Sequence, residues 1–353
     1  MVRPHGVKNS KQMRKYTFLL IALTAMAFSC VWQKEPAQEN VATPYALEAP
    51  AKFPKISIPE DNPMTVEGVA MGRRIYYDRS LNTQKVGVAC SDCHQQKAGF
   101  SSPGEKGQLA IMPHVNLAYE TSFLWNGAEQ GILEDVMLFE IKDFFAADLS
   151  YVNADAEYKR LAKVAFGKDD IDYQTMAYAL AQFSRTQLSG NSKFDQYNRG
   201  EIQLSEQEKR GLELFFSEDG DCFHCHSTVL FSDSDFHNIG LDSTFNLGNA
   251  GRYVISQDSV DIGKFKTPSL RNIAVSAPYM HDNRFETLEQ VVDFYAEGVH
   301  FTKYTDPLMK HEGGINLNQQ QRVDLIAFLN TLTDESYLSN EELSNPFNTN
   351  EKN

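Results

Sequence analysis

The chain has 353 residues, 42% hydrophobic and 23% charged, which leaves room for about two globular domains and excludes disorder over most of its length. Its 33 basic and 47 acidic residues give a formal net charge of −14. This balance excludes a general nucleic-acid binder, which needs a basic face to displace counterions, and suits a small cationic partner better.

The first thirty residues have the pattern of an export signal. Basic residues within positions 11–15 precede an apolar run over residues 16–29, which is too short to span a bilayer. Cys30 directly follows, as in the lipobox of bacterial lipoproteins, where the cysteine is freed by cleavage and acylated. We therefore predict a signal peptide over residues 1–29 and a periplasmic protein with a lipid anchor on Cys30; a soluble secreted protein is the alternative.

Residues 30–60 contain five prolines and are predicted to form an extended tether. Cleavage of residues 1–29 would remove five basic residues and no acidic one, so the mature chain would be more acidic than the precursor. We expect its partners to be selected by this negative field.

Two segments with similar sequences come next in chain order, each ahead of a cysteine motif. We predict short helices over residues 67–77 and 208–216, each ending in an aromatic pair. They are followed by Cys90-Ser91-Asp92-Cys93-His94 and by Cys222-Phe223-His224-Cys225-His226. This C-x-x-C-H spacing is the attachment signature of c-type haem, because two thiols reach the porphyrin as thioethers and the next imidazole lies under the iron.

Two other interpretations of the four cysteines are weaker. A zinc site built from both C-x-x-C pairs, or two redox disulfides, would not require a histidine directly after each second cysteine. We therefore predict two covalently bound haem c groups, one on Cys90, Cys93 and His94 and the other on Cys222, Cys225 and His226.

The remaining elements are helical by their apolar periodicity, and strand-like alternation is rare. The periodic positions are Met176, Leu180 and Phe183; Leu288, Val291, Val292 and Tyr295; and Leu325, Phe328, Leu329 and Leu332. A polar stretch at residues 198–200 is the predicted boundary. The predicted fold class is mostly α, with two tandem cytochrome c-like domains over residues 61–199 and 200–340 and a tail over residues 341–353.

Several stretches make the resemblance to a known family specific. Residues 265–273, 277–282, 123–127, 183–186 and 324–329, together with the two haem motifs, resemble the bacterial di-haem cytochrome c peroxidase and MauG family. The likeness runs from about residue 63 to residue 334. It implies that the haem on His226 accepts electrons and that the haem on His94 is where hydrogen peroxide is cleaved.

The resemblance also implies roles for single residues. Trp125 falls where the family places a tryptophan between the haems, where an indole can relay an electron; a tryptophan of the core is the alternative. The family's sixth ligand at the C-terminal haem is methionine in peroxidases and tyrosine in MauG-type members, and that position is Tyr295 here. A phenolate is expected to lower the potential of this haem, although Tyr295 also fits the apolar stripe of its own helix. Met280 is nearby but is not the family's ligand.

The N-terminal site departs from the family pattern. The loop of residues 95–112 has no histidine to cap the iron, and His114 at its end fits a core or surface residue better than a ligand, so we expect a five-coordinate haem. No carboxylate aligns with the family's proton-moving glutamate. Glu140 is the nearest substitute and Asp143 the next; an exposed helical carboxylate is the alternative for both.

A family calcium ion is left open by the sequence. It is held by backbone carbonyls near Ser276 and Pro278 and by an asparagine side chain, whose place is taken here by Ala110. Among the other histidines, His237 and His300 are expected to be solvated or satisfied, and His281 receives no role. A homodimer is also left open.

Three functions remain after this comparison. The leading one is a peroxidase that reduces hydrogen peroxide to water with electrons from a small c-type cytochrome or cupredoxin. The second is a MauG-like oxidase that acts on a protein or organic substrate, which Tyr295 favours. The third is a di-haem electron carrier without enzymatic activity.

Overall fold

The computed structural model describes residues 1–2, 41–227, 229–309 and 312–347, and these residues are mostly helical, as the sequence predicts. The predicted signal peptide, Cys30 and the first part of the predicted tether lie outside the described residues. The chain divides into two units, residues 1–41 and residues 42–353, and every described helix and strand belongs to the second unit.

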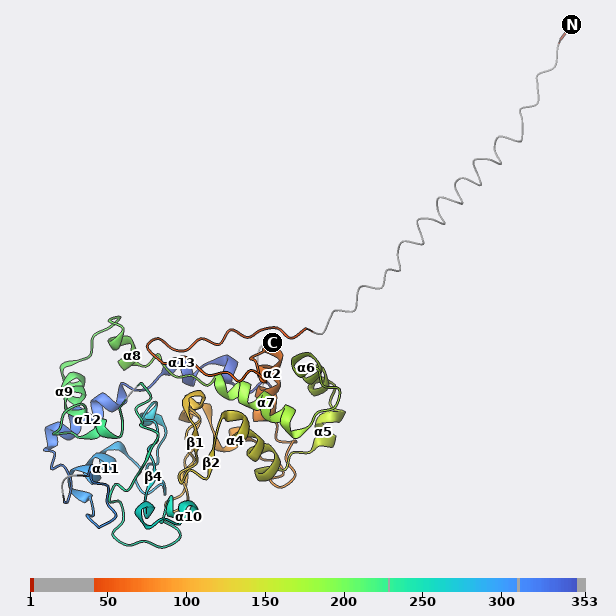
Figure 1. The fold of residues 1–353 in the computed structure, drawn as a ribbon. Coiled ribbons are helices and arrows are strands. Elements are labelled where there is room, and N and C mark those ends of the chain that lie inside the picture. Colours follow the sequence, from red (N-terminus) through yellow and green to blue (C-terminus); the bar gives the residue numbers. More distant parts are fainter. Residues whose placement is uncertain (3–40, 228, 310–311, 348–353) are drawn as a thin grey trace. The chain divides into compact units, whose positions relative to one another are not determined.

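The helices vary from one turn to about four turns (Figure 1). They are α2 (Val66–Tyr77), α3 (Cys90–Cys93), α4 (Leu133–Phe139), α5 (Leu149–Ala154), α6 (Ala156–Phe166), α7 (Tyr173–Arg185), α8 (Lys193–Asn198), α9 (Glu206–Phe215), α10 (Tyr253–Ser256), α11 (Leu288–Asp293), α12 (Gln319–Asn330) and α13 (Glu335–Leu338). Two π-helical segments, η3 (Glu140–Phe144) and η7 (Phe294–Gly298), directly continue α4 and α11. The strands are two-residue antiparallel pairs: β1 (Ser122–Phe123) with β2 (Glu129–Gln130), and β3 (Phe236–His237) with β4 (Phe265–Lys266).

Both helices predicted ahead of the cysteine motifs are confirmed, and a hydroxyl side chain begins each of them. The Thr65 hydroxyl accepts a hydrogen bond from the Gly68 backbone N–H (3.0 Å) at the start of α2. The Ser205 hydroxyl accepts one from the Glu208 N–H (3.3 Å) at the start of α9. These caps satisfy N–H groups that the first helical turn leaves without a partner.

Each of these helices packs against a later helix at close range, α2 against α7 and α9 against α12. Glycine permits the approach in both pairs: a Cβ atom on Gly72 would lie 2.0 Å from the Ala179 carbonyl oxygen, and one on Gly211 would lie 1.9 Å from that of Asp324. The two helix pairs therefore meet through the same device, a glycine on the first helix facing the backbone of the second.

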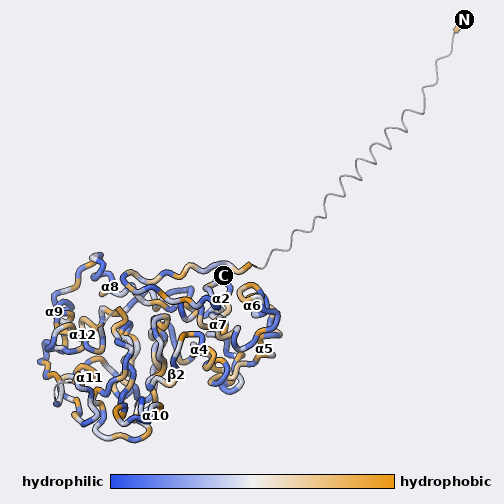
Figure 2. The backbone as a smooth tube through the Cα atoms, in the orientation of Figure 1, coloured by the Kyte–Doolittle hydropathy of each residue, from blue (hydrophilic) through white to orange (hydrophobic). Residues whose placement is uncertain are grey.

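The core is made of separate hydrophobic clusters. The first cluster draws on α2, α4, α6 and α7, and the second on α9, α11 and α12; within the unit of residues 42–353 these two sets of helices lie at different ends in Figure 1. Figure 2 shows hydrophobic residues interspersed with hydrophilic ones along the helices. In the described part of the chain, no helix has the length and apolar character needed to cross a membrane.

Two buried ion pairs fix elements around the clusters. Arg185 donates to both carboxylate oxygens of Glu134 (2.6 and 2.5 Å) and joins α7 to α4. Arg271 does the same to Asp195 (2.8 and 3.0 Å) and anchors the loop that follows β4 to α8. Such two-point pairs hold direction as well as distance.

The last described residues pack back onto the first half of the unit. The Arg73 guanidinium donates to the Ser344 carbonyl (2.6 Å), and the Tyr77 hydroxyl donates to the Leu343 carbonyl (2.6 Å). The Gln96 amide, just after the first cysteine motif, donates to the Asn340 carbonyl (2.8 Å). Tyr337 and Leu343 accordingly belong to the first hydrophobic cluster.

Candidate functional site

The second cysteine motif forms a tight turn that presents its histidine. Residues Cys222–His224 make a 3₁₀ turn, and the His226 N–H donates to the Cys222 carbonyl (2.9 Å). The Nδ1 atom of His226 donates to the Phe231 carbonyl (2.9 Å). This bond fixes the ring tautomer and leaves Nε2 free to bind a metal, and burial lowers the pKa of His226, which favours the neutral, metal-binding form.

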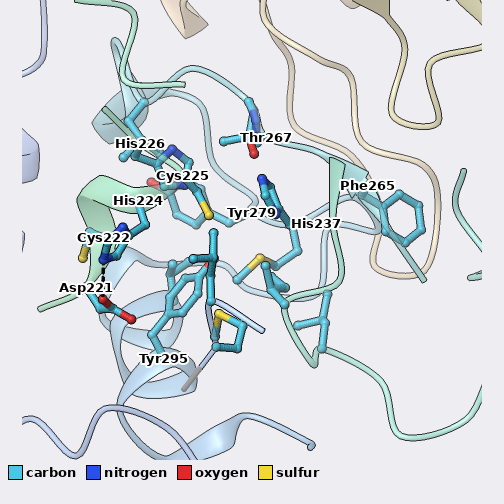
Figure 3. Close-up of a pocket in the computed structure, with 18 of the residues that line it drawn as sticks. Asp221, Cys222, His224, Cys225, His226, His237, Phe265, Thr267, Tyr279 and Tyr295 are labelled. Carbon is cyan, nitrogen blue, oxygen red and sulfur yellow. Dashed lines mark ion pairs between the residues drawn. The ribbon is translucent and has the colours of Figure 1, made fainter. Parts of the chain in front are cut away.

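A cavity of about 210 Å³ lies against this turn. Figure 3 shows Tyr295 pointing from its helix into the cavity and Cys222, Cys225 and His226 on the facing wall. Apolar side chains supply most of the remaining wall, among them Phe215, Leu241, Ile273, Leu288, Val292 and Leu325. An apolar cavity with two thiols and an imidazole on one wall and a phenol on the other fits the predicted haem.

Tyr295 lies close to both thiols of the motif. Its pKa is raised, first by burial and then by the nearby Cys225 and Cys222. Tyr295 lies in the π-helical segment η7, a geometry that often occurs at functional sites. The structure therefore brings together the four residues that the sequence assigns to the C-terminal haem.

The first cysteine motif is built in the same way as the second. The His94 N–H donates to the Cys90 carbonyl (2.8 Å), and the His94 Nδ1 donates to the Phe100 carbonyl (3.0 Å). Burial lowers the pKa of His94 to about 4. The imidazole is therefore neutral near pH 7 and its Nε2 is able to bind a metal.

The likeness of the two motifs extends into the chain that follows each of them. Phe100 and Phe231, which accept the histidine bonds, both have positive φ angles (58° and 53°). The next residue in each case is a buried serine whose hydroxyl donates to a later carbonyl, Ser101 to Ile111 (2.6 Å) and Ser232 to Thr267 (2.8 Å).

Further along, both segments turn at the same kind of residue. Asn116 and Asn272 have φ angles of 58° and 62°, and each precedes a three-residue 3₁₀ turn. The N–H of the residue two positions earlier donates to the phenylalanine carbonyl in both halves, His114 to Phe100 (3.1 Å) and Leu270 to Phe231 (3.3 Å). The phenylalanine, the serine after it, the asparagine and the residue two positions before the asparagine therefore have counterparts in the two halves.

By this correspondence, Glu140 is the counterpart of Tyr295. In both α4 and α11 the N–H of the N-cap residue donates to the side chain three positions on, Ile132 to Asp135 (2.9 Å) and Thr287 to Gln290 (3.3 Å), and both helices continue into a π-helical segment. Glu140 and Tyr295 lie the same number of residues after these N-caps. Burial raises the pKa of the Cys90 thiol, and the charge of Glu140 is the next largest cause. The Glu140 carboxyl therefore lies close enough to its own cysteine motif for its charge to act on the Cys90 thiol.

The environment of Glu140 brings the pKa of its carboxyl close to neutral pH. Burial raises its pKa to about 7, the charge of Glu129 adds to the rise, and Lys85 opposes it. Asp143, the other carboxylate that the sequence offers, is exposed on the surface. The structure thus distinguishes the two candidates for the proton-moving carboxylate: Glu140 is partly buried and Asp143 is exposed.

Trp125 lies in the turn between β1 and β2 and lines the cavity. Its indole N–H donates to the Ala110 carbonyl (2.8 Å), and its own carbonyl accepts a bond from the Lys266 N–H of β4 (2.8 Å). Trp125 therefore joins the loop after the first motif to the wall of the second site. The calcium ion that the resemblance implies stays a prediction.

His237 is a feature that the sequence analysis missed. Its Nδ1 bonds to an Asp306 oxygen (2.7 Å) and its Nε2 to an Asp233 oxygen (2.8 Å), at the edge of the same cavity. The hydrogen bond to Asp233, followed by that to Asp306, raises the pKa of His237 to about 12. Asp306 is 69 residues away along the chain, so no local sequence pattern predicts that His237 is held between two carboxylates.

We expect His237→Gln to destabilise the protein in a pH-dependent manner. Because the folded pKa of about 12 lies above the ordinary value of 6.5, the stabilisation is complete below pH 6.5 and is lost as the pH rises toward 12. The loss should be about 2 kcal/mol near pH 6, the scale of hydrogen bonds to charged groups, and smaller at pH 10. Urea unfolding at both pH values measures it, with the exposed His300→Gln as control; equal losses at both pH values contradict the expectation.

The alternative interpretations of the cysteines find no support in the described residues. No disulfide joins the four motif cysteines in the structure, and among the described residues the two groups that could hold a metal ion are Cys225 with Asp233 and His237, and Glu218 with Asp221 and His224. Neither group joins the two C-x-x-C pairs. In the described residues, the geometry therefore offers no zinc site shared between the two motifs.

Comparison with known proteins shows which proteins this chain resembles. The family model described as "Di-haem cytochrome c peroxidase" matches residues 66–203. The methylamine utilization protein MauG of Methylophilus methylotrophus is 31% identical over 331 residues, which cover 89% of this chain and 94% of that protein. A cytochrome-c peroxidase of Pseudomonas sp. is 28% identical, covering 89% of this chain and 91% of its own. The crystal structure of a MauG-like protein associated with microbial copper homeostasis has 32% identity and a TM-score of 0.77, over 86% of this chain and 99% of that one.

Proposed function

Because this chain belongs to the family of di-haem cytochrome c peroxidases and MauG proteins, and is therefore an oxidoreductase, we propose that it reduces hydrogen peroxide to water. The electrons come from a small c-type cytochrome or cupredoxin, drawn to the acidic surface by charge. The two reactions are divided between two tandem cytochrome c-like domains, residues 61–199 and 200–340.

The residues that hold the two haems follow from the paired motifs. Cys90 and Cys93 attach one haem with His94 as its proximal ligand; Cys222 and Cys225 attach the other with His226 as the proximal ligand and Tyr295 facing it. The haems supply redox-active iron that exchanges electrons with peroxide and donor. The chain fixes both imidazoles through their Nδ1 bonds to Phe100 and Phe231.

The position of Glu140 carries the proposal. At the first motif Glu140 takes the place that Tyr295 has at the second. We assign this carboxyl group a role in the reaction with peroxide and not in binding the iron, so that the iron position stays open for peroxide. With a pKa of about 7, Glu140 is able both to accept a proton from one peroxide oxygen and to deliver it to the other. Cleavage of peroxide to water needs this proton transfer.

A second candidate function is favoured by Tyr295 and by the MauG relatives. In this alternative the oxidising equivalents from peroxide oxidise a protein or organic substrate instead of being reduced by electrons from the donor. A hard, anionic phenolate favours the oxidised iron and makes the second haem a weaker acceptor for electrons from a high-potential donor.

The test begins with the protein carrying both haems. A pyridine haemochrome assay should count two haems per chain that denaturing acid–acetone does not extract. Hydrogen peroxide is then added, followed by a reduced small cytochrome c. Rapid oxidation of the cytochrome supports the peroxidase; a long-lived spectral change that the cytochrome does not reverse supports the MauG-like oxidase; the absence of any response to peroxide leaves an electron carrier and overturns both enzymatic functions.

We expect Trp125→Phe to slow the peroxide-dependent oxidation of cytochrome c by at least about tenfold, equivalent to about 1.4 kcal/mol of barrier. The indole joins the loop after the first motif to the second site, and phenylalanine keeps an aromatic ring but loses the bond to Ala110. Stopped-flow spectroscopy separates the steps: the first reaction with peroxide should keep its wild-type rate. An unchanged rate of cytochrome oxidation would make Trp125 a core residue.

The export features complete the proposal. A signal peptide over residues 1–29 and acylation of Cys30 place the protein in the periplasm, tethered to the membrane. Labelling with a radioactive fatty acid, compared between the wild type and Cys30→Ser, tests the anchor. Calcium and a homodimer stay predictions.

A further inference from the structure

A second histidine lies directly against the proximal histidine of the first motif. The rings of His94 and His114 are stacked, with centroids 3.5 Å apart and an angle of 18° between their planes. Three contacts hold His114 in place. Its Nδ1 lies 3.2 Å from the hydroxyl of the buried Tyr76, its N–H donates to the Phe100 carbonyl (3.1 Å), and its carbonyl accepts from the Tyr337 hydroxyl (2.6 Å).

The second motif has an apolar residue at the same position. Leu270 is the counterpart of His114, because the N–H of each donates to the phenylalanine carbonyl that also accepts from the motif histidine. Leu270 packs against the second hydrophobic cluster and lines the cavity. The two halves therefore support their motif histidines differently, one with a polar ring and the other with an aliphatic side chain.

The stacked geometry does not fit a role for His114 as the iron ligand opposite His94. Two imidazoles that bind one iron from opposite sides both approach it end-on through a ring nitrogen, so their faces do not stack on one another. His114 instead covers one face of the His94 ring and is held by the Tyr76 hydroxyl at its Nδ1 atom.

We propose that His114 is a positioning residue for the proximal ligand of the N-terminal haem. The bond to Phe100 fixes the His94 ring at Nδ1. The stacked ring of His114, held by Tyr76, supports the face of the His94 imidazole and places a polar group beside it. The inference rests on the proposed function, since it requires a haem on His94. Partners of this kind orient a ligand and tune the potential of its metal.

The test uses His114→Leu in the protein carrying both haems. Leucine is the residue that the second half already accommodates at this position, so the variant is expected to fold. An apolar neighbour disfavours the more positively charged oxidised iron, so the equilibrium constant for reduction of the N-terminal haem should rise about tenfold, about 59 mV for one electron. The electron paramagnetic resonance signal of this haem should change its rhombicity, while the C-terminal haem keeps both properties.

Two further variants divide the effect. His114→Phe keeps a ring that stacks and should retain the wild-type resonance shape while showing the raised potential. Tyr76→Phe removes the tether and should broaden the resonance signal. The exposed His300→Leu is the matched control and should change nothing.

Two results would overturn the inference. A wild-type potential and resonance signal in His114→Leu would leave His114 as core packing, and conversion of a low-spin N-terminal haem to high spin would make it an iron ligand. The haem count of the wild-type protein reports separately on the proposed function: fewer than two haems per chain overturns that function, whereas two haems and an unaltered variant overturn only this inference.

Discussion

Glu140→Gln is expected to lower the turnover of hydrogen peroxide by about 10²–10⁴-fold, the range for loss of a positioned acid–base group. The amide keeps the size of the side chain but cannot take up and release a proton. Both haems should stay attached, since Glu140 makes none of the contacts that position His94 or His226. Initial rates of peroxide consumption, normalised to haem content, measure the effect.

The matched control for this variant is Asp143→Asn, three residues along the same π-helical segment and exposed. It should retain the wild-type rate. The reverse outcome, a wild-type rate in Glu140→Gln and a large loss in Asp143→Asn, would reject the pairing of Glu140 with Tyr295.

The same carboxyl gives the reaction a pH dependence. With the pKa of Glu140 raised to about 7, the ionised form that accepts the peroxide proton prevails above pH 7 and is lost as the pH falls below it. The rate with peroxide should therefore decrease from pH 8 to pH 6. Glu140→Gln should remove this slope, which distinguishes the loss of a proton acceptor from a general disturbance of the site.

Tyr295→Met is expected to raise the reduction potential of the C-terminal haem by on the order of 0.2 V, within the range of about 0.8 V that axial ligands span. A hard, anionic phenolate stabilises the oxidised iron, whereas a soft, neutral thioether stabilises the reduced iron. Spectroelectrochemical titration measures the change. If the wild type acts as a MauG-like oxidase, the variant should also gain the ability to accept electrons from a reduced cytochrome c.

Tyr279→Phe provides the control, because Tyr279 lines the same cavity but its hydroxyl donates to the Ile273 carbonyl (3.0 Å). It should leave the potential unchanged. An unchanged potential in Tyr295→Met would return Tyr295 to the role of a core residue on its apolar helix face, the alternative that the sequence leaves open.

The parts of this molecule that could be predicted from its sequence are those fixed by neighbours in the chain. The C-x-x-C-H spacings and the helices ahead of them depend on residues a few positions apart, and the structure has both helices within two residues of their predicted starts. The later helices were likewise predicted from their apolar periodicity, and their periodic apolar residues lie in the two main hydrophobic clusters.

The rest depends on contacts between distant segments. Glu140 was only a nearest substitute in sequence, because a glutamate and a tyrosine share no pattern; their equivalence emerges from the helix and π-segment that carry each of them. His114 was treated as a core or surface residue, and its stacking on His94 depends on how a twenty-residue loop returns to the motif. His237 needs Asp306 from a separate segment.

The backbone groups that Arg73 and Tyr77 bind belong to residues 344 and 343, which are synthesised long after α2. A nascent chain that has not yet reached residues 343 and 344 already contains α2 but lacks the carbonyl groups that Arg73 and Tyr77 bind. A fragment ending near residue 200 would likewise lack Tyr337 and Leu343 from its own cluster. Expressing the N-terminal half by itself therefore requires the C-terminal segment to be grafted onto it, and cutting the chain between the two motifs is a poor way to isolate the first centre.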